Sequence, residues 1–300
     1  MRQAFCNSLV KHANKPEFVF LTGDLGFKAL EPLQAAMPEC FINAGVAEQN
    51  MVSVAAGLTR GGFRAWTYSI APFQYARPFE QIRNDVCLPG LPVVLVGNGG
   101  GYGYGAMGSS HHALEDYGCL LTLPPMRAFV PAFDVDIPPM ISSLMRISGP
   151  AYLRLGLSEE PNGWPVPEYA SWRRLLRGNG PALVAVGPLV GTLLSPLSQL
   201  PESHRPDLWV VSELPIAELP SSFLESLQRT RRLVVIEEHT AHGGFGQMLV
   251  HSLATAGEPI HSFTHRHALG YVSGLYGSQK FHRAECGLDP DSIVAAVTAR

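Results

Sequence analysis

Short runs of apolar residues, each about the length of one buried strand, recur along this chain and limit the folds it can adopt. They lie at residues 18–21, 91–97, 182–186, 208–211 and 233–236, and residues 151–155 form a further expected strand that contains one arginine, Arg154. A short apolar run bounded by turn residues is typical of a strand buried on both faces of a parallel sheet. Helical patterns separate these runs, so the sequence predicts repeated strand–helix–strand units.

A segment rich in proline, glycine and charge divides the chain. It runs from residue 158 to residue 180, and we expect it to be a linker. With 300 residues, of which 46% are apolar, the chain can form one large or two ordinary domains. The sequence therefore predicts an α/β fold of two consecutive three-layer domains with mainly parallel sheets, over residues 1–157 and 181–300.

The composition of the chain excludes some classes of binding partner and indicates the cellular compartment. The formal net charge of −3 offers no basic surface, which argues against nucleic acid or an anionic membrane as a partner. No apolar run has the length of a membrane span or of a signal-peptide core. The five cysteines are odd in number and have no paired spacing, as expected for reduced thiols in a cytoplasmic protein.

The first candidate site residue is Glu48. The segment from Gly45 to Leu58 has apolar residues at mixed spacing, which predicts a helix buried on most sides, with Glu48 in its first turn. Burying a carboxylate in apolar surroundings is costly unless the group is protonated or hydrogen-bonded to something specific. The alternative is that this glutamate only interacts with the helix dipole.

A glycine-rich loop, residues 98–108, follows the strand at 91–97 and precedes His111. A dinucleotide fingerprint is excluded because the glycines extend too far and the next helix begins only near Ser110. His111 and Glu115 lie one helical turn apart, but no third ligand at a recognised spacing completes a zinc site. The alternative for His111 is a water-exposed histidine at a helix start.

Asp24 and Lys28 follow the strand at residues 18–21. Ligands of an open parallel sheet bind beyond the carboxyl ends of its strands, which places Asp24, and with it Lys28, near a site. The alternative for Asp24 is a turn residue, because Gly-Asp is common in turns.

Three motifs are similar to those of one enzyme family. Residues 45–51, Gly-Val-Ala-Glu-Gln-Asn-Met, resemble the signature of the pyrimidine-binding domain of transketolases and their thiamine-diphosphate relatives. The glycine-rich loop with Ser-His, followed by Leu-Pro-Pro-Met at 123–126, looks like the substrate-facing loop of that family. Residues 237–246 are similar to the C-terminal domain of transketolase-like and deoxyxylulose-phosphate-synthase-like enzymes, where His239 and His242 would be chiefly structural. The resemblance spans roughly residues 2–297.

The sequence predicts four cofactor-binding residues, three of which the resemblance implies. In this family, the glutamate at the position of Glu48 hydrogen-bonds the aminopyrimidine ring of thiamine diphosphate. Phe73 and Ile70 fall where side chains pack on that ring, although an aromatic residue is usual at the position of Ile70. Asp24 is the fourth predicted cofactor-binding residue, on the ground of its position just after a strand and not of the resemblance.

The resemblance also implies a substrate site. His111 matches the histidine that faces the bound substrate, and Lys28 stands where the family often has a phosphate-contacting serine. Met107 falls where sugar-phosphate transketolases have an acidic residue, and Leu157 where they have an arginine that holds the acceptor's phosphate. Losing such a bidentate donor is not conservative, and Lys28 would replace it only in part. The substrate therefore stays open.

A motif of full-length transketolases is missing here. Their first domain binds the diphosphate through a metal with a Gly-Asp-Gly motif, and this sequence contains none. The resemblance thus implies a split enzyme, in which a separate N-terminal transketolase-like, diphosphate-binding subunit completes the site. Thiamine diphosphate would be shared between the chains, Mg²⁺ or Ca²⁺ would be bound by the partner chain, and this chain would bind no metal. Two copies of each chain would form an α₂β₂ heterotetramer.

The predicted activity is the transfer of a two-carbon ketol unit from a ketose-type donor to an aldehyde acceptor. Glu48 would activate the cofactor, and His111 would hydrogen-bond or exchange protons with the substrate hydroxyls. One alternative is another thiamine-diphosphate enzyme, either like deoxyxylulose-phosphate synthase or like the β-subunit of a 2-oxo acid dehydrogenase. The other alternative is a non-catalytic scaffold subunit.

Overall fold

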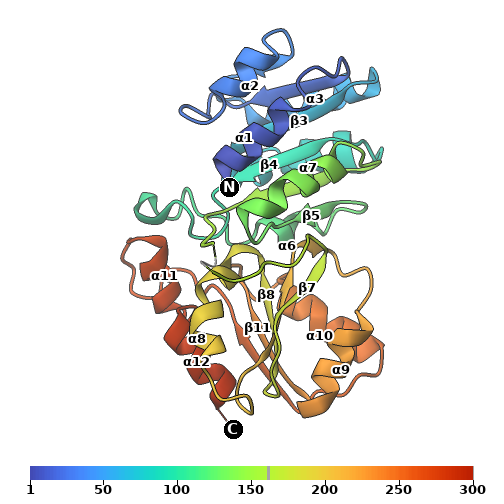
Figure 1. Cartoon of the computed structure of the whole chain (residues 1–300). Helices are drawn as coiled ribbons and strands as arrows, with labels where there is room; N and C mark the ends of the chain where they lie inside the picture. Colours follow the sequence, from blue (N-terminus) through green and yellow to red (C-terminus); the bar gives the residue numbers. More distant parts are fainter. Residues whose placement is uncertain (161–162, 300) are drawn as a thin grey trace.

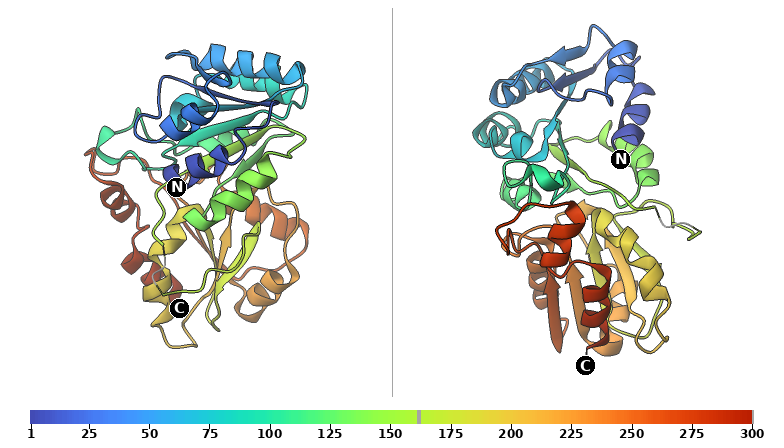
Figure 2. Two further views of the ribbon diagram at one scale, coloured as in Figure 1. Left: turned by 45° about the horizontal axis from the view of Figure 1, so that its top comes forward. Right: turned by 90° about the vertical axis from the view of Figure 1, so that its left-hand side faces the viewer.

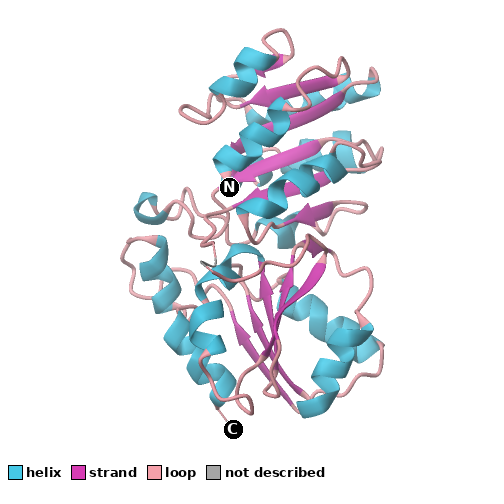
Figure 3. Cartoon of the chain, in the orientation of Figure 1, coloured by secondary structure: helices cyan, strands magenta, loops and turns pink. Residues whose placement is uncertain are grey.

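The chain folds around two mainly parallel sheets. The structure is a computed structural model that describes residues 1–160 and 163–299. One sheet has seven strands in the order β10-β5-β6-β4-β3-β1-β2, and the other has five in the order β12-β11-β8-β9-β7. The sheets occupy different parts of the molecule (Figures 1 and 3). We call residues 1–160 the N-terminal half and residues 163–299 the C-terminal half; the first sheet is built from the N-terminal half except for β10, which comes from the C-terminal half. The predicted α/β fold with two mainly parallel sheets is confirmed.

The seven strands of the first sheet are all parallel to their neighbours except β10, which runs antiparallel to β5. They are β1 (Phe18–Thr22), β2 (Phe41–Asn43), β3 (Arg64–Ile70), β4 (Val94–Asn98), β5 (Arg127–Phe129), β6 (Ala151–Leu155) and β10 (Glu213–Leu214). The helices of the N-terminal half are α1 (Arg2–Val10), α2 (Glu31–Ala36), α3 (Glu48–Arg60), α4 (Ala71–Tyr75), α5 (Phe79–Gln81), the π-helical η1 (Ile82–Cys87), α6 (Asp116–Leu120) and α7 (Ile137–Leu144), with 3₁₀ turns η2 (Gly105–Met107) and η3 (Asp134–Asp136).

The second sheet is parallel except for β7, which pairs antiparallel with β9. Its strands are β7 (Trp172–Leu176), β8 (Ala182–Val186), β9 (Asp207–Val211), β11 (Arg232–Ile236) and β12 (Ser262–Arg266). Its helices are the 3₁₀ helix η4 (Gly187–Thr192), α8 (Leu194–Ser198), α9 (Ser221–Thr230), α10 (Phe245–Thr255), α11 (Gln279–Glu285) and α12 (Pro290–Thr298). None of the helices in the described ranges is both long and apolar enough to cross a membrane.

Helices cover both faces of each sheet (Figure 2). On one face of the first sheet, Phe5 of α1 and Ile141 of α7 belong to a buried cluster with Trp66 of β3. On the other face, Met51 of α3 belongs to a cluster that continues to Val184 of β8 in the C-terminal half. Burial of apolar area is the main favourable term in folding, so this shared core stabilises the contact between the halves.

The boundary between the halves differs from the expected linker at 158–180. Residues 172–176 form β7, in which Arg173 is buried between the half-buried Trp172 and Arg174. β10, far along the chain, joins the first sheet instead of the second. The division at residues 157 and 181 therefore stays a prediction, with β7 inside the expected linker; residues 161 and 162 lie outside the described part of the chain.

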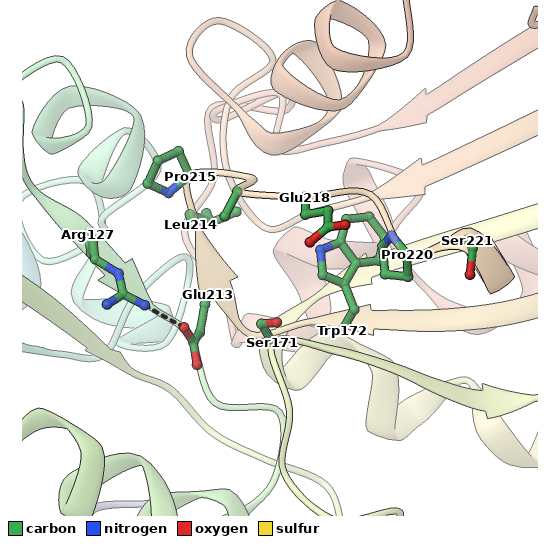
Figure 4. A pocket seen from close by; sticks show the side chains of 10 residues that line it. Arg127, Ser171, Trp172, Glu213, Leu214, Pro215, Glu218, Pro220 and Ser221 are labelled. Atoms are coloured by element: carbon green, nitrogen blue, oxygen red, sulfur yellow. Dashed lines mark hydrogen bonds and ion pairs between the residues drawn. The ribbon is translucent and has the colours of Figure 1, made fainter. Parts of the chain in front are cut away.

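The junction between the halves, which we call the seam, is also joined by ion pairs. Arg127 of β5 bonds Glu213 of β10 with a Nη2–Oε2 distance of 2.8 Å (Figure 4). These two residues line a cavity of about 680 Å³ together with Trp172, Glu218 and Pro220. None of the residues predicted for the functional site lines this cavity.

Candidate functional site

Glu48 is the first residue of α3, and its carboxylate is buried against the carboxyl ends of β1 and β3. Only 3% of Glu48 is exposed. Ser69 Oγ donates to Oε1 at 3.3 Å, and Arg77 Nη1 donates to Oε2 at 2.9 Å. Gly23 leaves room beside it, since a Cβ there would lie 3.7 Å from the carboxylate. Glu48 is therefore buried as expected, but its surroundings are not wholly apolar, because a cation and a hydroxyl supply the specific hydrogen bonds that burial of a carboxylate requires.

The helix that Glu48 begins is also less buried than expected. Its buried residues, among them Met51, Val52, Ala55 and Ala56, form one face, whereas Val54 is exposed. This is the spacing of an amphipathic helix that covers one side of a sheet.

Aromatic and cationic groups continue from Glu48 toward the glycine-rich loop. The Arg77 guanidinium lies over the Phe73 ring, 4.0 Å from its centroid, which is a cation–π contact. The Phe73 ring meets the His111 imidazole edge to face, with 5.3 Å between centroids. His111 also packs on Tyr104 at 5.8 Å. The structure thus brings Glu48, Phe73 and His111 into one continuous cluster.

His111 lies in a turn instead of at a helix start, because α6 begins only at Asp116. Its backbone N–H donates to the Gly108 carbonyl at 3.0 Å, and its Nδ1 lies 2.9 Å from Ser110 Oγ. The expectation of a helix beginning near Ser110 is wrong because the loop is held by turns around Gly105 and Gly108, both at positive φ.

The other predicted residues lie at the same edge of the sheet but make different contacts. Ile70 ends β3 and is buried, and strand alternation directs it to the face opposite Ser69. Asp24 accepts a hydrogen bond from Asn43 Nδ2 at 2.8 Å, and it lines a cavity of about 340 Å³ in the loop after β1. The Lys28 N–H bonds Glu31, and both Asp24 and Lys28 have positive φ. Strained backbone of this kind is frequent in ligand loops.

The two histidines assigned a chiefly structural role differ in their surroundings. His239 is buried, its ring stacks on Tyr117 at 3.9 Å, and its Nε2 accepts from the Gly118 N–H at 3.1 Å. Burial lowers the pKa of His239, which keeps the imidazole neutral as that acceptor role requires. His242 lines a cavity of about 480 Å³ between the halves.

A buried carboxylate, Glu237, organises the same region. It accepts from the Tyr117 hydroxyl, from the Phe245 N–H at 2.7 Å and from the Gly246 N–H at 2.8 Å. Burial alone would raise the pKa of Glu237, but hydrogen bonds from His265 and Tyr117 hold it below the usual value. This network supports the start of α10 and lies outside the Glu48 cluster.

Sequence reasoning missed Ser69 and Arg77. Arg77 lies four residues after Phe73, a spacing at which side chains on a helix meet. This spacing was the one sequence signal that could have predicted the contact between Arg77 and Phe73. Its pairing with Glu48, 29 residues away, had no local signal. The described ranges contain no group of three or more His, Cys, Asp or Glu residues placed to hold a metal ion.

The fold is that of a two-domain α/β protein, and this cluster is a candidate ligand site at the carboxyl ends of parallel strands. The sequence matches the family models "Transketolase, pyrimidine binding domain" over residues 1–159 and "Transketolase, C-terminal domain" over residues 171–293. The chain belongs to the transketolase family, which confirms the resemblance seen in its motifs.

Curated relatives include separate subunits and longer enzymes. One subunit of the apulose-4-phosphate transketolase of Actinobacillus succinogenes is 30% identical over 277 residues, which cover 88% of this chain and 86% of that protein. 1-Deoxy-D-xylulose-5-phosphate synthase 2 of Geobacter sulfurreducens is 32% identical over 281 residues, or 89% of this chain and 43% of that protein. The chain is thus homologous both to a separate subunit and to less than half of a longer enzyme.

Solved structures agree with this pattern. A structure described as a split-gene transketolase, an inactive β4 tetramer, is 30% identical with a TM-score of 0.79 and covers 99% of this chain and 96% of its own. The transketolase of Leishmania mexicana has a TM-score of 0.76 at 17% identity, over 98% of this chain and 44% of its own, and this likeness concerns the fold alone. The chain is therefore homologous to the β-subunit of a split transketolase.

Proposed function

We propose that this chain is the cofactor-activating subunit of a thiamine-diphosphate-dependent transketolase that is active only with a partner subunit. The observation that carries the proposal is the buried Glu48 carboxylate at the start of α3, joined through Arg77 and Phe73 to His111. The homology to a split-transketolase subunit supports it.

The residues present fit the aminopyrimidine end of the cofactor. Such a ring needs a carboxylate at a ring nitrogen and an aromatic or apolar surface against its face, and Glu48 and Phe73 supply these groups. Ile70 stays a prediction, because strand alternation in β3 directs its side chain to the face opposite Ser69. A carboxylate offers about four lone-pair sites, of which Ser69 and Arg77 occupy two, so Glu48 retains capacity for a further hydrogen bond. We assign Asp24 to the same end of the site, where the strained loop after β1 supports a ligand role.

The bound cofactor supplies a carbanion-stabilising centre for carbon–carbon cleavage and formation. Glu48 holds or accepts a proton at its carboxylate oxygens, and Ser69 and Arg77 fix the orientation of the carboxylate. His111, with its Nδ1 beside Ser110, presents Nε2 to the substrate hydroxyls. We assign Lys28, on the exposed loop after β1, to the distal end of the substrate.

We propose that the partner is an N-terminal transketolase-like subunit that holds the diphosphate through Mg²⁺ or Ca²⁺, in an α₂β₂ heterotetramer in the cytoplasm. Exposed apolar side chains support a covering subunit here: Phe27 is 80% exposed, Val46 74% and Leu88 82%. Phe27 and Val46 lie in the loops that follow the paired strands β1 and β2, and exposed apolar residues gathered in one region mark protein interfaces. All five cysteines are free thiols, which supports a reducing compartment.

The two departures from sugar-phosphate transketolases, Met107 in the glycine-rich loop and Leu157 after β6, bear on specificity. Met107 is 56% exposed and Leu157 58% exposed. Neither side chain grips a phosphate bidentately, so we propose that the acceptor is held differently from that of sugar-phosphate transketolases. An assay with two donor substrates distinguishes transketolase from synthase activity. Turnover of hydroxypyruvate would support the ketol transfer proposed here, and turnover of pyruvate would support a synthase.

The test is calorimetric titration of thiamine diphosphate with Mg²⁺ into this chain, into the partner and into the two together. We expect binding by the pair and by neither chain alone. Tight binding by this chain alone would refute the need for a partner, and no binding in any combination would leave a scaffold subunit. Glu48→Gln should retain the fold of the pair while losing donor turnover.

A further inference from the structure

A segment of the C-terminal half packs on the loop that carries His111. We call residues 269–283 the clamp segment; it includes most of α11, which lies beside the glycine-rich loop (Figure 1) and contacts η2. The Tyr102 hydroxyl donates to the Gly270 carbonyl at 2.7 Å, and its ring stacks on His282 with 4.9 Å between centroids. The base of the loop is therefore built in part by the other half of the protein.

Tyr271 of the clamp segment anchors the residue next to His111. His112 Nε2 lies 2.8 Å from the Gly105 carbonyl oxygen, and His112 Nδ1 lies 2.9 Å from the Tyr271 hydroxyl. A carbonyl oxygen only accepts, so Nε2 carries the proton and Nδ1 accepts from Tyr271. Removing this hydroxyl would leave a buried acceptor unsatisfied, since only 4% of His112 is exposed.

Tyr276 anchors the other side of His111. Its hydroxyl lies 3.1 Å from Ser109 Oγ, and its ring lies so close to Gly108 that a Cβ at that glycine would approach it to 3.1 Å. Gly108 in turn accepts the hydrogen bond of the His111 N–H at 3.0 Å. The two tyrosines thus hold the loop before and after the histidine.

We infer that Tyr271 and Tyr276 are positioning residues that fix His111 against Phe73. The C-terminal half thereby takes part in the site without placing a group at the reacting atoms. The inference rests on the proposed function, because the position of His111 matters to turnover only if His111 meets the substrate.

The first test uses the isolated chain. Tyr271→Phe and Tyr276→Phe should each speed amide hydrogen exchange over residues 105–112 by about fivefold. Each should also speed carbethoxylation of His111 by diethylpyrocarbonate by about fivefold. This factor corresponds to the loss of one hydrogen bond of ordinary net strength. Tyr169→Phe is the matched control, because it loses a hydroxyl bonded to Glu213 at 2.6 Å, on the seam. Unchanged exchange and unchanged His111 reactivity in both variants would overturn the inference.

The second test uses the pair of subunits with hydroxypyruvate as donor. Each tyrosine variant should lower kcat/KM about fivefold, whereas the same change in a His111→Ala background should cause no further loss. Additive losses would show that the tyrosines act independently of His111 and would overturn the inference. A wild-type pair that binds no cofactor and transfers no ketol unit would instead refute the proposed function, and the exchange data on the isolated chain distinguish the two failures.

Discussion

Arg173→Met measures how strongly one buried ion pair holds the two halves together. Arg173 of β7 bonds Asp136 of η3 through two contacts of 2.7 Å, and only 2% of the arginine side chain and 1% of the aspartate side chain are exposed. The Ala132 and Phe133 amides also donate to Asp136, at 2.9 and 3.1 Å. This carboxylate therefore joins a strand of the second sheet to a turn of the first half.

The expected cost follows from the charge that is left behind. Removing one partner of a buried pair costs about 3–5 kcal/mol. In Arg173→Met the two amides still serve Asp136, so we expect the low end, about 3 kcal/mol. With about 2.1 cal/mol/K of unfolding entropy per residue, a chain of 300 residues should lose about 5 °C in Tm.

Arg127→Met is the matched control, since its pair with Glu213 also crosses the seam, but 49% of the arginine side chain is exposed. Exposed pairs contribute about 0.2–1 kcal/mol, so its Tm should fall by less than about 2 °C. Calorimetry and urea unfolding of both variants provide the measurements. Equal shifts for Arg173→Met and Arg127→Met would refute the argument from burial.

Three further changes test other parts of the structure. Glu48→Ala should abolish donor turnover by the pair while leaving the fold intact by circular dichroism; normal turnover would exclude Glu48 from cofactor activation. Burial holds the pKa of His239 below its ordinary value of about 6.5, so the unfolded chain binds a proton more readily, and the free energy of unfolding should fall as pH drops below about 6.5. His239→Gln should flatten that dependence in urea unfolding between about pH 6.5 and 5.5, and an unchanged slope would contradict it. Gly97→Ala drives a Cβ into the Tyr152 ring and hydroxyl and should destabilise by about 1–3 kcal/mol, whereas Gly149→Ala, with no heavy atom within 4 Å, should not; similar unfolding midpoints would refute the steric argument.

The sequence predicted the central strands because their signal is local. The apolar runs that became β1, β4, β8, β9 and β11 are buried on both faces, so their central residues are hydrophobic in succession, and β6 follows the same pattern except for the buried Arg154. β7 was missed because Arg173 and Arg174 read as a charged loop. Arg173 is buried only because Asp136, 37 residues earlier, neutralises it. β2 and β12 were missed because they are short or polar edge strands.

In the candidate site too, features with a local sequence signal could be predicted, and features that depend on distant segments could not. The positions of Glu48 at a helix start and of Asp24 after a strand follow from local pattern, and the structure places both at the carboxyl edge of the sheet. The Arg77 contact with Glu48 and the clamp on His112 depend on chain segments 29 and 159 residues apart. No pattern in a single sequence encodes such pairs, because they exist only once the sheet and the second half are packed.

The antiparallel strand β10 protects the first sheet as well as extending it. Its backbone pairs with β5 through Leu214 and Ala128, and Ser212 accepts from the Val130 N–H at 2.8 Å. An N-terminal fragment cut at residues 158–180 would lack β10 and expose the polar backbone edge of β5. Such open edges recruit strands from other molecules, so we expect the N-terminal half to be prone to aggregation until β10, the last strand of the first sheet in chain order, has been synthesised.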